Sequence, residues 1–451
     1  MPTPSVEHLS PEGTNTDGHR LMARLFDVPM HDLRDSRQTS TGAADHRTIL
    51  VDAGCKADAL EHLATQIDAW RNDARVDVVF NLLGPKEGQT GLFNDAAQRV
   101  WREVLLPRAS VVVATQSIVQ SLPRAAAVCV PADGGDVDAV WIQTTHANGW
   151  LTMPQGASGA QLCAHMAPAL ACAMARGFVV ADAAVLATMA VAHPRLGFAS
   201  KPALLPFLSW GAEPAPATGA ASDASDPCMG LYVIVDSISR LHQVLRAGAR
   251  TVQLRIKRSP DASHRWQAQF ADTCRQGVEL ARQYGAELFI NDHWEQALHC
   301  GASAVHLGQE DLLAMDAATR QTLLQSGLRL GVSTHSLWEL CRARTLAPRY
   351  VACGPVWPTL TKEMPWKPQG LHNLRWWSDM AGVPVVAIGG ILEPSQAEQA
   401  AACQVGGVCV VRGLGNSVTE RVQAFQRALQ AGMSAPRGPT VEWPMPSLEA
   451  A

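Results

Sequence analysis

The chain has 451 residues, enough for two or three domains, and 47% of them are hydrophobic, so large cores are expected. The formal net charge of -4 argues against a nucleic-acid-binding protein, since such proteins usually carry a basic patch. No apolar run reaches about 18 residues, so no membrane span is expected. The N-terminus lacks the apolar stretch of a secretory signal, and the 11 cysteines include no CxxC pair, which favours a cytoplasmic protein with reduced thiols.

Three segments have compositions that cannot fill a core. Residues 1–45 are polar without a sustained period, and we expect a mobile arm. Residues 211–228 are rich in Pro, Ala, Ser and Asp, which predicts a linker, and residues 433–451 predict a disordered tail. Two folded blocks remain, over residues 46–210 and 229–432.

The first block predicts an α/β layer domain. Its apolar runs lie at 48–54, 76–84, 109–116 and 138–144, and stretches with helical spacing separate them.

The second block repeats one pattern eight times. Short apolar runs lie at 231–235, 251–256, 287–290, 303–307, 329–332, 350–353, 383–388 and 407–411. Helical stretches lie between them, and parallel strands need such crossover helices. Eight units in about 200 residues predict a closed (β/α)8 barrel, also called a TIM barrel. An open doubly wound sheet is the alternative fold.

Polar or glycine clusters follow nearly every predicted strand, on the face where such barrels carry their chemistry. Alternation over 253–257 predicts that Gln253, Arg255 and Lys257 point the same way, and two of them are cations that suit phosphate oxygens. Asp292 and Asp311 follow neighbouring strands and suit Mg²⁺. Further phosphate-binding candidates are Thr359, Thr361, Lys362, Gly389 and Gly390. The set predicts a magnesium-bound diphosphate beside a second phosphate.

Each of these residues also has a purely structural interpretation. Asp292 could cap the helix that follows it, and Lys257 could be a solvated charge. The two threonines could order the turn at Pro358, and the two glycines could serve only close packing. The placement of all of them on one predicted face favours the functional interpretation.

The second block also resembles a known family. The stretches LYVIVD, TVQLRIK, LFINDHW, VHLGQEDL, LRLGVSTH, GPVWPTLTK, PQGL and VAIGGI occur in order and resemble those of thiamine-phosphate synthase. The resemblance covers about residues 229–430 and implies a TIM barrel. It also implies an enzyme that joins hydroxymethylpyrimidine diphosphate to hydroxyethylthiazole phosphate and releases diphosphate.

The resemblance implies roles for residues that match the family's motifs. Gln253 would contact the pyrimidine, Arg255, Lys257 and Asn291 its diphosphate, and Asp292 and Asp311 would ligate Mg²⁺. Ser333 and Lys362 would hold the leaving diphosphate, while Thr359, Thr361, Gly390, Val411 and Arg412 would surround the thiazole phosphate. Leu254, Ile256 and Leu360 complete the implied substrate-binding set. The family usually has Ser where this chain has Arg412, which alters that pocket.

The family's mechanism matches this inventory. The pyrimidine C–O bond breaks first, and the thiazole nitrogen then attacks the resulting methylene cation with its free lone pair. No strong general base is needed, so charge neutralisation and positioning supply the catalysis.

The first block resembles part of hydroxymethylpyrimidine phosphate kinase, a ribokinase-fold family, over residues 78–116 and 156–177. The family's N-terminal glycine-rich substrate motif is absent, and an Asp-Pro of the family is Asn81-Leu82 here. Where the family carries the catalytic base beside its anion hole, this chain has Ala160. We therefore expect a truncated, degenerate ribokinase-like domain without phosphoryl transfer.

Four functions remain open at this point. The leading one is a thiamine-phosphate synthase with small-molecule substrates, and the first alternative is a bifunctional kinase and synthase. The first block could instead be a binding or oligomerisation module. A thiazole tautomerase is the fourth, and the retained diphosphate residues argue against it. Barrels of this size often pair, so a homo-oligomer stays open.

Overall fold

A computed structural model describes residues 4–11, 16–33, 46–83, 99–120, 122, 126–130, 136–193, 202–215, 228–257, 264–359 and 365–449. The chain divides into two compact units. One consists mainly of Met1–Ala199 and Ala203–Thr218, and the other mainly of Gly219–Ser447. Most of the predicted linker, 216–227, lies outside the described residues.

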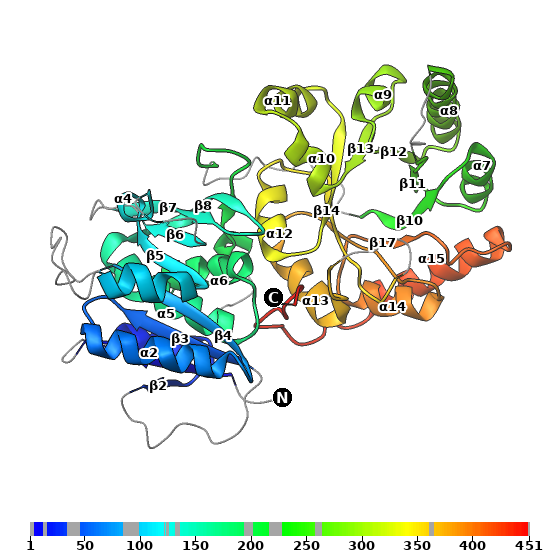
Figure 1. Cartoon of the computed structure of the whole chain (residues 1–451). Helices are drawn as coiled ribbons and strands as arrows, with labels where there is room; N and C mark the ends of the chain where they lie inside the picture. Colours follow the sequence, from blue (N-terminus) through cyan, green and yellow to red (C-terminus); the bar gives the residue numbers. More distant parts are fainter. Residues whose placement is uncertain are drawn as a thin grey trace. The chain divides into compact units, whose positions relative to one another are not determined.

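The second unit is a closed barrel of eight parallel strands (Figure 1), which confirms the predicted fold. The strands are β10 (Gly230–Val235), β11 (Thr251–Leu254), β12 (Glu287–Asn291), β13 (Ala304–Leu307), β14 (Arg329–Thr334), β15 (Tyr350–Cys353), β16 (Val385–Ala387) and β17 (Gly407–Val410). Strand β17 pairs with β10 in parallel, with Leu231 opposite Val408. This closure excludes the open-sheet alternative.

Helices surround the barrel and connect its strands. They are α7 (Ile238–Arg246), α8 (His264–Gln283), α9 (Trp294–His299), α10 (Gln309–Ala314), α11 (Ala317–Gln325), α12 (Leu337–Arg344), α13 (Gly370–Met380), α14 (Pro394–Ala402) and α15 (Val418–Ser434). None of the helices in the described ranges has the length and apolar character that a membrane crossing needs.

Three aromatic rings fill the middle of the barrel. Tyr232, Phe289 and Tyr350 are buried, and their ring centroids lie 5.3–5.5 Å apart. A Cβ atom at Gly331 would lie 2.4 Å from the Tyr350 ring, so the glycine makes room for it. The barrel interior is therefore packed, and its chemistry is restricted to the ends of the strands.

The first unit contains a nine-stranded sheet among its described residues, in the order β2-β1-β3-β4-β5-β6-β7-β8-β9. The strands are β1 (Val6–Leu9), β2 (Met30–Asp32), β3 (His46–Asp52), β4 (Arg75–Asn81), β5 (Val111–Thr115), β6 (Ala127–Val130), β7 (Asp136–Gln143), β8 (Asn148–Ser158) and β9 (Phe207–Leu208). Strands β1 to β6 pair in parallel, and β6 to β9 pair antiparallel. The ribokinase likeness of this unit stays a prediction.

Helices cover both faces of this sheet. They are α1 (Asp17–Leu25), α2 (Ala57–Trp70), α4 (Gln116–Gln120), α5 (Gly159–Ala175) and α6 (Val180–Ala192), with short helices η1 (Trp101–Leu105), η2 (Leu106–Arg108) and η3 (Pro202–Leu204). Ile49 and Val51 of β3 pack with Leu60 and Leu63 of α2 in one core cluster. Helix α5 contacts β3 and β4 as well, and α1 packs on α5. Because side chains alternate along a strand, a sheet covered on both faces is buried throughout.

The predicted mobile arm over 1–45 is wrong for its described residues. Strand β1 pairs in parallel with β3, and β2 extends the sheet by one more strand. Strand β1 was not predicted because it contains the polar residues Glu7 and His8. In the fold, each of these residues has a partner on β3. Glu7 accepts a 2.6 Å bond from Arg47, and His8 lies 2.8 Å from Asp52.

The predicted disordered tail over 433–451 is also wrong for its described part. After α15 the chain runs along α13. There the side-chain Nδ2 and Oδ1 atoms of Asn373 both form hydrogen bonds with its backbone. Asn373 donates to the Met445 carbonyl at 2.9 Å and accepts from the Met445 amide at 2.6 Å. The composition correctly suggests no core of its own, but side chains of α13 that bond to its backbone order the segment.

Candidate functional site

Strand β11 ends earlier than the sequence predicts. The strand alternation predicted over 253–257 is therefore wrong beyond Leu254, where the strand stops. Gln253 is buried, while Arg255 and Ile256 are half-buried and Lys257 is exposed. The Arg255 amide still donates to the Val235 carbonyl at 2.7 Å, which holds this residue at the strand end.

The side chain of Leu254 points away from the barrel interior. Its Cδ2 atom lies 3.3 Å from where a Cβ atom of Gly277 in α8 would be. Leu254 therefore can reach a substrate only through its main chain, and its binding role stays a prediction.

Asp292 follows β12 in a backbone conformation that is uncommon for residues with side chains. Its φ is +65°, and its amide donates to the His306 carbonyl at 2.9 Å. Helix α9 is capped by His293 without a side-chain bond, so Asp292 is not its N-cap. A left-handed conformation without a capping role is typical of a residue held for function.

Acidic groups gather around Asp292. Partial burial and the nearby charge of Asp311 raise the pKa of Asp292, and Glu310 adds to this effect while Arg255 opposes it. Asp311 lies in the first turn of α10, where its Oδ2 accepts a 2.8 Å bond from the Gly308 amide. Carboxylates that repel one another at a strand end are suited to share a hard dication.

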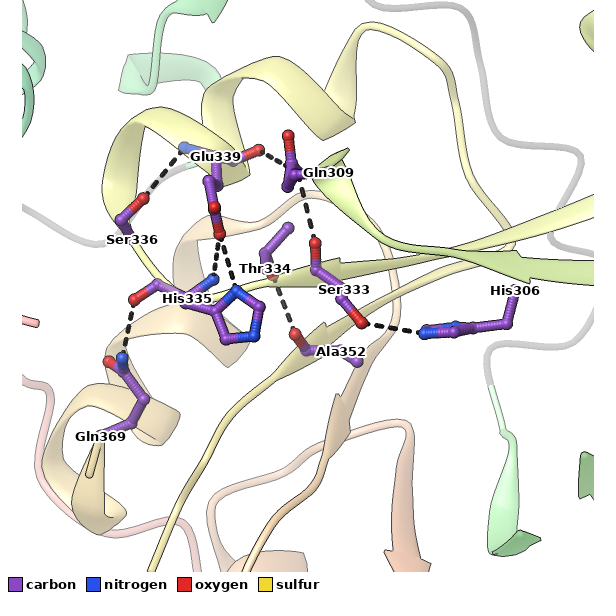
Figure 2. Close-up of polar contacts among 9 residues, drawn as sticks. All are labelled: His306, Gln309, Ser333, Thr334, His335, Ser336, Glu339, Ala352 and Gln369. Atoms are coloured by element: carbon purple, nitrogen blue, oxygen red, sulfur yellow. Dashed lines mark hydrogen bonds and ion pairs between the residues drawn. The ribbon is translucent and has the colours of Figure 1, made fainter. Parts of the chain in front are cut away.

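Ser333 lies at the end of β14 in a continuous hydrogen-bond network (Figure 2). Its Oγ lies 2.9 Å from His306 Nε2, and its carbonyl accepts a bond from Gln309. Thr334 donates to the Ala352 carbonyl at 3.0 Å, which fixes the strand end to β15.

Figure 2 also shows how Glu339 of α12 holds the turn after Ser333. Its Oε2 accepts from the His335 amide at 2.6 Å and lies 3.0 Å from His335 Nδ1. Ser336 caps the helix by accepting from the Glu339 amide, and Gln369 donates to the His335 carbonyl. The turn that follows Ser333 is therefore fixed from two helices.

A buried polar chain crosses the barrel beneath the site. His306 Nδ1 lies 2.7 Å from the Tyr350 hydroxyl, which lies 2.9 Å from the Tyr232 hydroxyl. Gln253 Nε2 donates to Tyr232 at 2.9 Å. The chain therefore links Ser333 to Gln253 through residues of five strands. Sequence reasoning missed its three inner members, because only barrel closure brings them together.

His306 is neutral in this chain. Burial, reinforced by the charge of Arg255, lowers its pKa to about 4. Both ring nitrogens have protein partners. His306 can therefore position Ser333 but has no free nitrogen for taking a substrate proton.

Gly389 and Gly390 approach the segment after β15 closely. Their φ values are +93° and +73°, and a Cβ atom at Gly390 would lie 2.7 Å from the Trp357 carbonyl oxygen and 2.8 Å from that of Pro358. The close packing that the sequence allowed is present, and it brings Gly390 beside the segment leading to Thr359. Thr359 is half-buried, whereas Leu360, Thr361 and Lys362 lie outside the described residues.

Val411 and Arg412 follow β17 and are both exposed. Gly413 packs on the main chain of Ile391 and Leu392, so the end of β17 lies beside the turn after β16. Neighbouring turns after the seventh and eighth strands form the usual phosphate site of this fold.

In the first unit, the predicted anion hole coincides with the start of α5. Ser158 accepts a 3.2 Å bond from the Gln161 amide, and Gln161 Oε1 accepts from the Ser158 amide at 2.9 Å. The helix therefore caps itself with two of its own side chains. Ala160 offers no group that could accept a proton.

Sequence comparisons place the barrel among known proteins. A sequence model described as thiamine monophosphate synthase matches residues 231–414. A thiamine-phosphate synthase of Yersinia pestis (strain Pestoides F) is 46% identical over 187 residues, which is 41% of this chain and 82% of the relative. One of Serratia proteamaculans (strain 568) is 45% identical over 190 residues, or 41% and 84%. A thiamine phosphate pyrophosphorylase structure from Pyrococcus furiosus is 27% identical, covers 46% of this chain and 98% of its own, and gives a TM-score of 0.40.

Proposed function

Because the chain belongs to the thiamine-phosphate synthase family, we propose that the C-terminal end of its barrel binds both substrates of that reaction. The enzyme is a transferase of thiamine biosynthesis that forms thiamine phosphate. In this proposal it joins hydroxymethylpyrimidine diphosphate to hydroxyethylthiazole phosphate and releases diphosphate. The observation that carries the proposal is the acidic pair Asp292 and Asp311 beside Arg255, at one end of the barrel.

Asp292 and Asp311 would hold Mg²⁺ in this enzyme. The raised pKa of Asp292, caused by partial burial and by Asp311, is what a carboxylate pair without its cation should show. When bound, Mg²⁺ supplies positive charge to the diphosphate oxygens. Arg255 and Lys257 would add two further cations from the end of β11, and Lys362 a third.

The chain's own residues would act on the leaving group and on orientation. As the pyrimidine C–O bond breaks, its electron pair stays on the diphosphate, where Arg255, Lys257 and Ser333 stabilise the charge. Gln253 would orient the pyrimidine ring. The thiazole nitrogen then forms the new C–N bond with its lone pair, and no proton has to move. This agrees with a neutral His306 whose nitrogens both have protein partners.

The thiazole phosphate would bind across the turns after β15, β16 and β17. Gly390 lies beside the segment leading to Thr359, and the end of β17 packs against the same turn. Arg412 would replace the smaller hydroxyl that the family usually has there, with a longer cationic side chain.

The first unit would not transfer phosphate. Ala160 has no acid–base group, and the start of α5 is capped by Ser158 and Gln161. The bifunctional alternative, in which this unit makes the diphosphate substrate from its monophosphate, therefore lacks a proton acceptor at that position.

We expect the purified full-length chain to form thiamine phosphate from hydroxymethylpyrimidine diphosphate, thiazole phosphate and Mg²⁺. A parallel reaction supplies the pyrimidine monophosphate with ATP, and we expect no product from it. Product analysis by chromatography distinguishes the two. Equal product in both reactions would establish the bifunctional alternative, and absence of product in both would refute the synthase proposal.

A further inference from the structure

Two histidines and one aspartate meet in the interior of the first unit. His8 from β1, His19 from α1 and Asp52 from the end of β3 are 6%, 7% and 8% exposed. Their ligand atoms all lie within 4.8 Å of one another, and they are the only such group of three among the residues that the structure describes. We propose that this cluster, the His8–His19–Asp52 site, binds a divalent transition-metal cation such as Zn²⁺.

The distances suit such a cation. Asp52 Oδ2 lies 2.8 Å from His8 Nε2 and 3.5 Å from His19 Nε2. Ligand atoms about 2.0–2.1 Å from a tetrahedral Zn²⁺ are roughly 3.3 Å from one another. Small side-chain shifts would therefore place one ion between the three groups.

The cluster also contains a buried carboxylate that stays ionised. The partners that the described residues give the Asp52 carboxylate are two imidazoles and the Asn81 amide. Burial opposes ionisation of Asp52, yet the bonds from His8 and Asn81 and the nearby His19 hold its pKa below the usual value. A buried carboxylate ordinarily acquires a cationic partner or a metal.

The imidazole of His19 has too few hydrogen-bond partners for a buried ring. Among the residues that the structure describes, its buried Nδ1 atom has no hydrogen-bond partner, and its Nε2 has only the long 3.5 Å approach to Asp52. Buried imidazoles usually have a partner for their nitrogens. A cation bound at Nε2 would give this ring a strong interaction that the protein alone does not supply.

Residues around the cluster orient the Asp52 carboxylate toward the proposed metal ion. Asn81, at the end of β4, donates to Asp52 Oδ1 at 2.8 Å and leaves Oδ2 directed at the imidazoles. The Leu83 amide in turn donates to Asn81 Oδ1 at 3.2 Å, which fixes the orientation of the amide. Metal-binding carboxylates are commonly held in this way.

A matched pair on the same sheet provides the control. His46 Nε2 lies 2.8 Å from Asp77 Oδ2, the same separation as in His8 and Asp52. Asp77 also accepts from Arg75 at 2.7 Å, so its charge has a cationic partner. The His46–Asp77 pair therefore needs no metal and should bind none.

The test uses full-length protein freed of metal by a chelator and then titrated with Zn²⁺ by calorimetry, with Mg²⁺ present to saturate the barrel carboxylates. We expect one Zn²⁺ per chain. His19→Ala and Asp52→Asn should each weaken binding by about 100-fold or more, and Asn81→Ala by about 10–100-fold. His46→Ala should leave the affinity unchanged.

Thermal unfolding and Co²⁺ absorption test the same proposal if a variant is less stable than the wild type. Zn²⁺ should raise the unfolding temperature of the wild type and of His46→Ala but not of His19→Ala. Co²⁺ should give visible absorption bands without the near-ultraviolet band of thiolate ligation. No Zn²⁺ binding, binding unchanged in His19→Ala, or a thiolate band would each overturn the proposal.

Discussion

Replacing Asp292 by Asn should lower kcat for thiamine phosphate formation by about 100-fold or more, while the barrel stays folded. The amide has nearly the shape of the carboxylate but no charge for Mg²⁺. Asn also tolerates the left-handed conformation that Asp292 adopts at φ +65°, whereas Ala would be strained there. The rate loss therefore reports on the metal site and not on the backbone.

The same substitution should make the metal-free protein slightly more stable at neutral pH. The pKa of Asp292 is raised in the folded chain by partial burial and by Asp311. An acid with a raised folded pKa destabilises the fold above that pKa, and the effect disappears as pH falls below the unfolded value. Solvent still reaches this carboxylate and screens its charge, so the gain should stay below about 1 kcal/mol.

Asp272→Asn serves as the matched control for Asp292→Asn. Asp272 lies on α8, where its exposed carboxylate pairs with Arg275. Its replacement should leave kcat and the Mg²⁺ requirement unchanged. Near-normal turnover in Asp292→Asn, measured at saturating substrates and wild-type Mg²⁺, would contradict the metal assignment.

Two substitutions of His306 should have unequal effects on kcat. The amide nitrogen of Gln can occupy the place of Nε2 and keep the bond to Ser333, whereas Asn can replace only Nδ1 and its bond to Tyr350. We expect His306→Asn to lower kcat about 10–100-fold more than His306→Gln, because Ser333 loses its anchor beside the leaving group.

Stability separates this positioning role from a packing role. Each variant leaves one buried polar group without its partner, which costs about 1–3 kcal/mol, so both should unfold at lower temperature to a similar extent. Steady-state kinetics and thermal unfolding on the same samples provide the comparison. Equal kcat values for the two variants would show that His306 serves only packing.

The barrel could be predicted from its sequence because its signals are local. Each apolar run ends in polar residues or glycine, and a helical stretch follows, so eight strands and their order are readable without any long-range information. Strand ends were less certain, as at β11, where the pattern QLRIK continues past the last paired residue, Leu254. Alternation indicates which side chains share a face but not where pairing stops.

Clusters of side chains that come together only when the strands assemble into sheets could not be predicted. His306, Tyr350 and Tyr232 lie far apart in the chain, and each looks like an ordinary strand residue. The same holds for Asp52, which ends a predicted strand, and for His8 and His19, which belong to a segment whose polarity suggested no fold. A buried polar residue becomes recognisable only when its partner is known, and that partner comes from a different strand or helix.

The central claim is that the C-terminal end of the barrel binds diphosphate through Mg²⁺ held by Asp292 and Asp311. The most direct measurement is calorimetric titration of the full-length chain with inorganic diphosphate, with Mg²⁺ and again with chelator. We predict measurable binding with Mg²⁺, a loss of at least about tenfold in affinity with chelator, and a similar loss in Asp311→Asn. Equal affinity in all three conditions would contradict the claim.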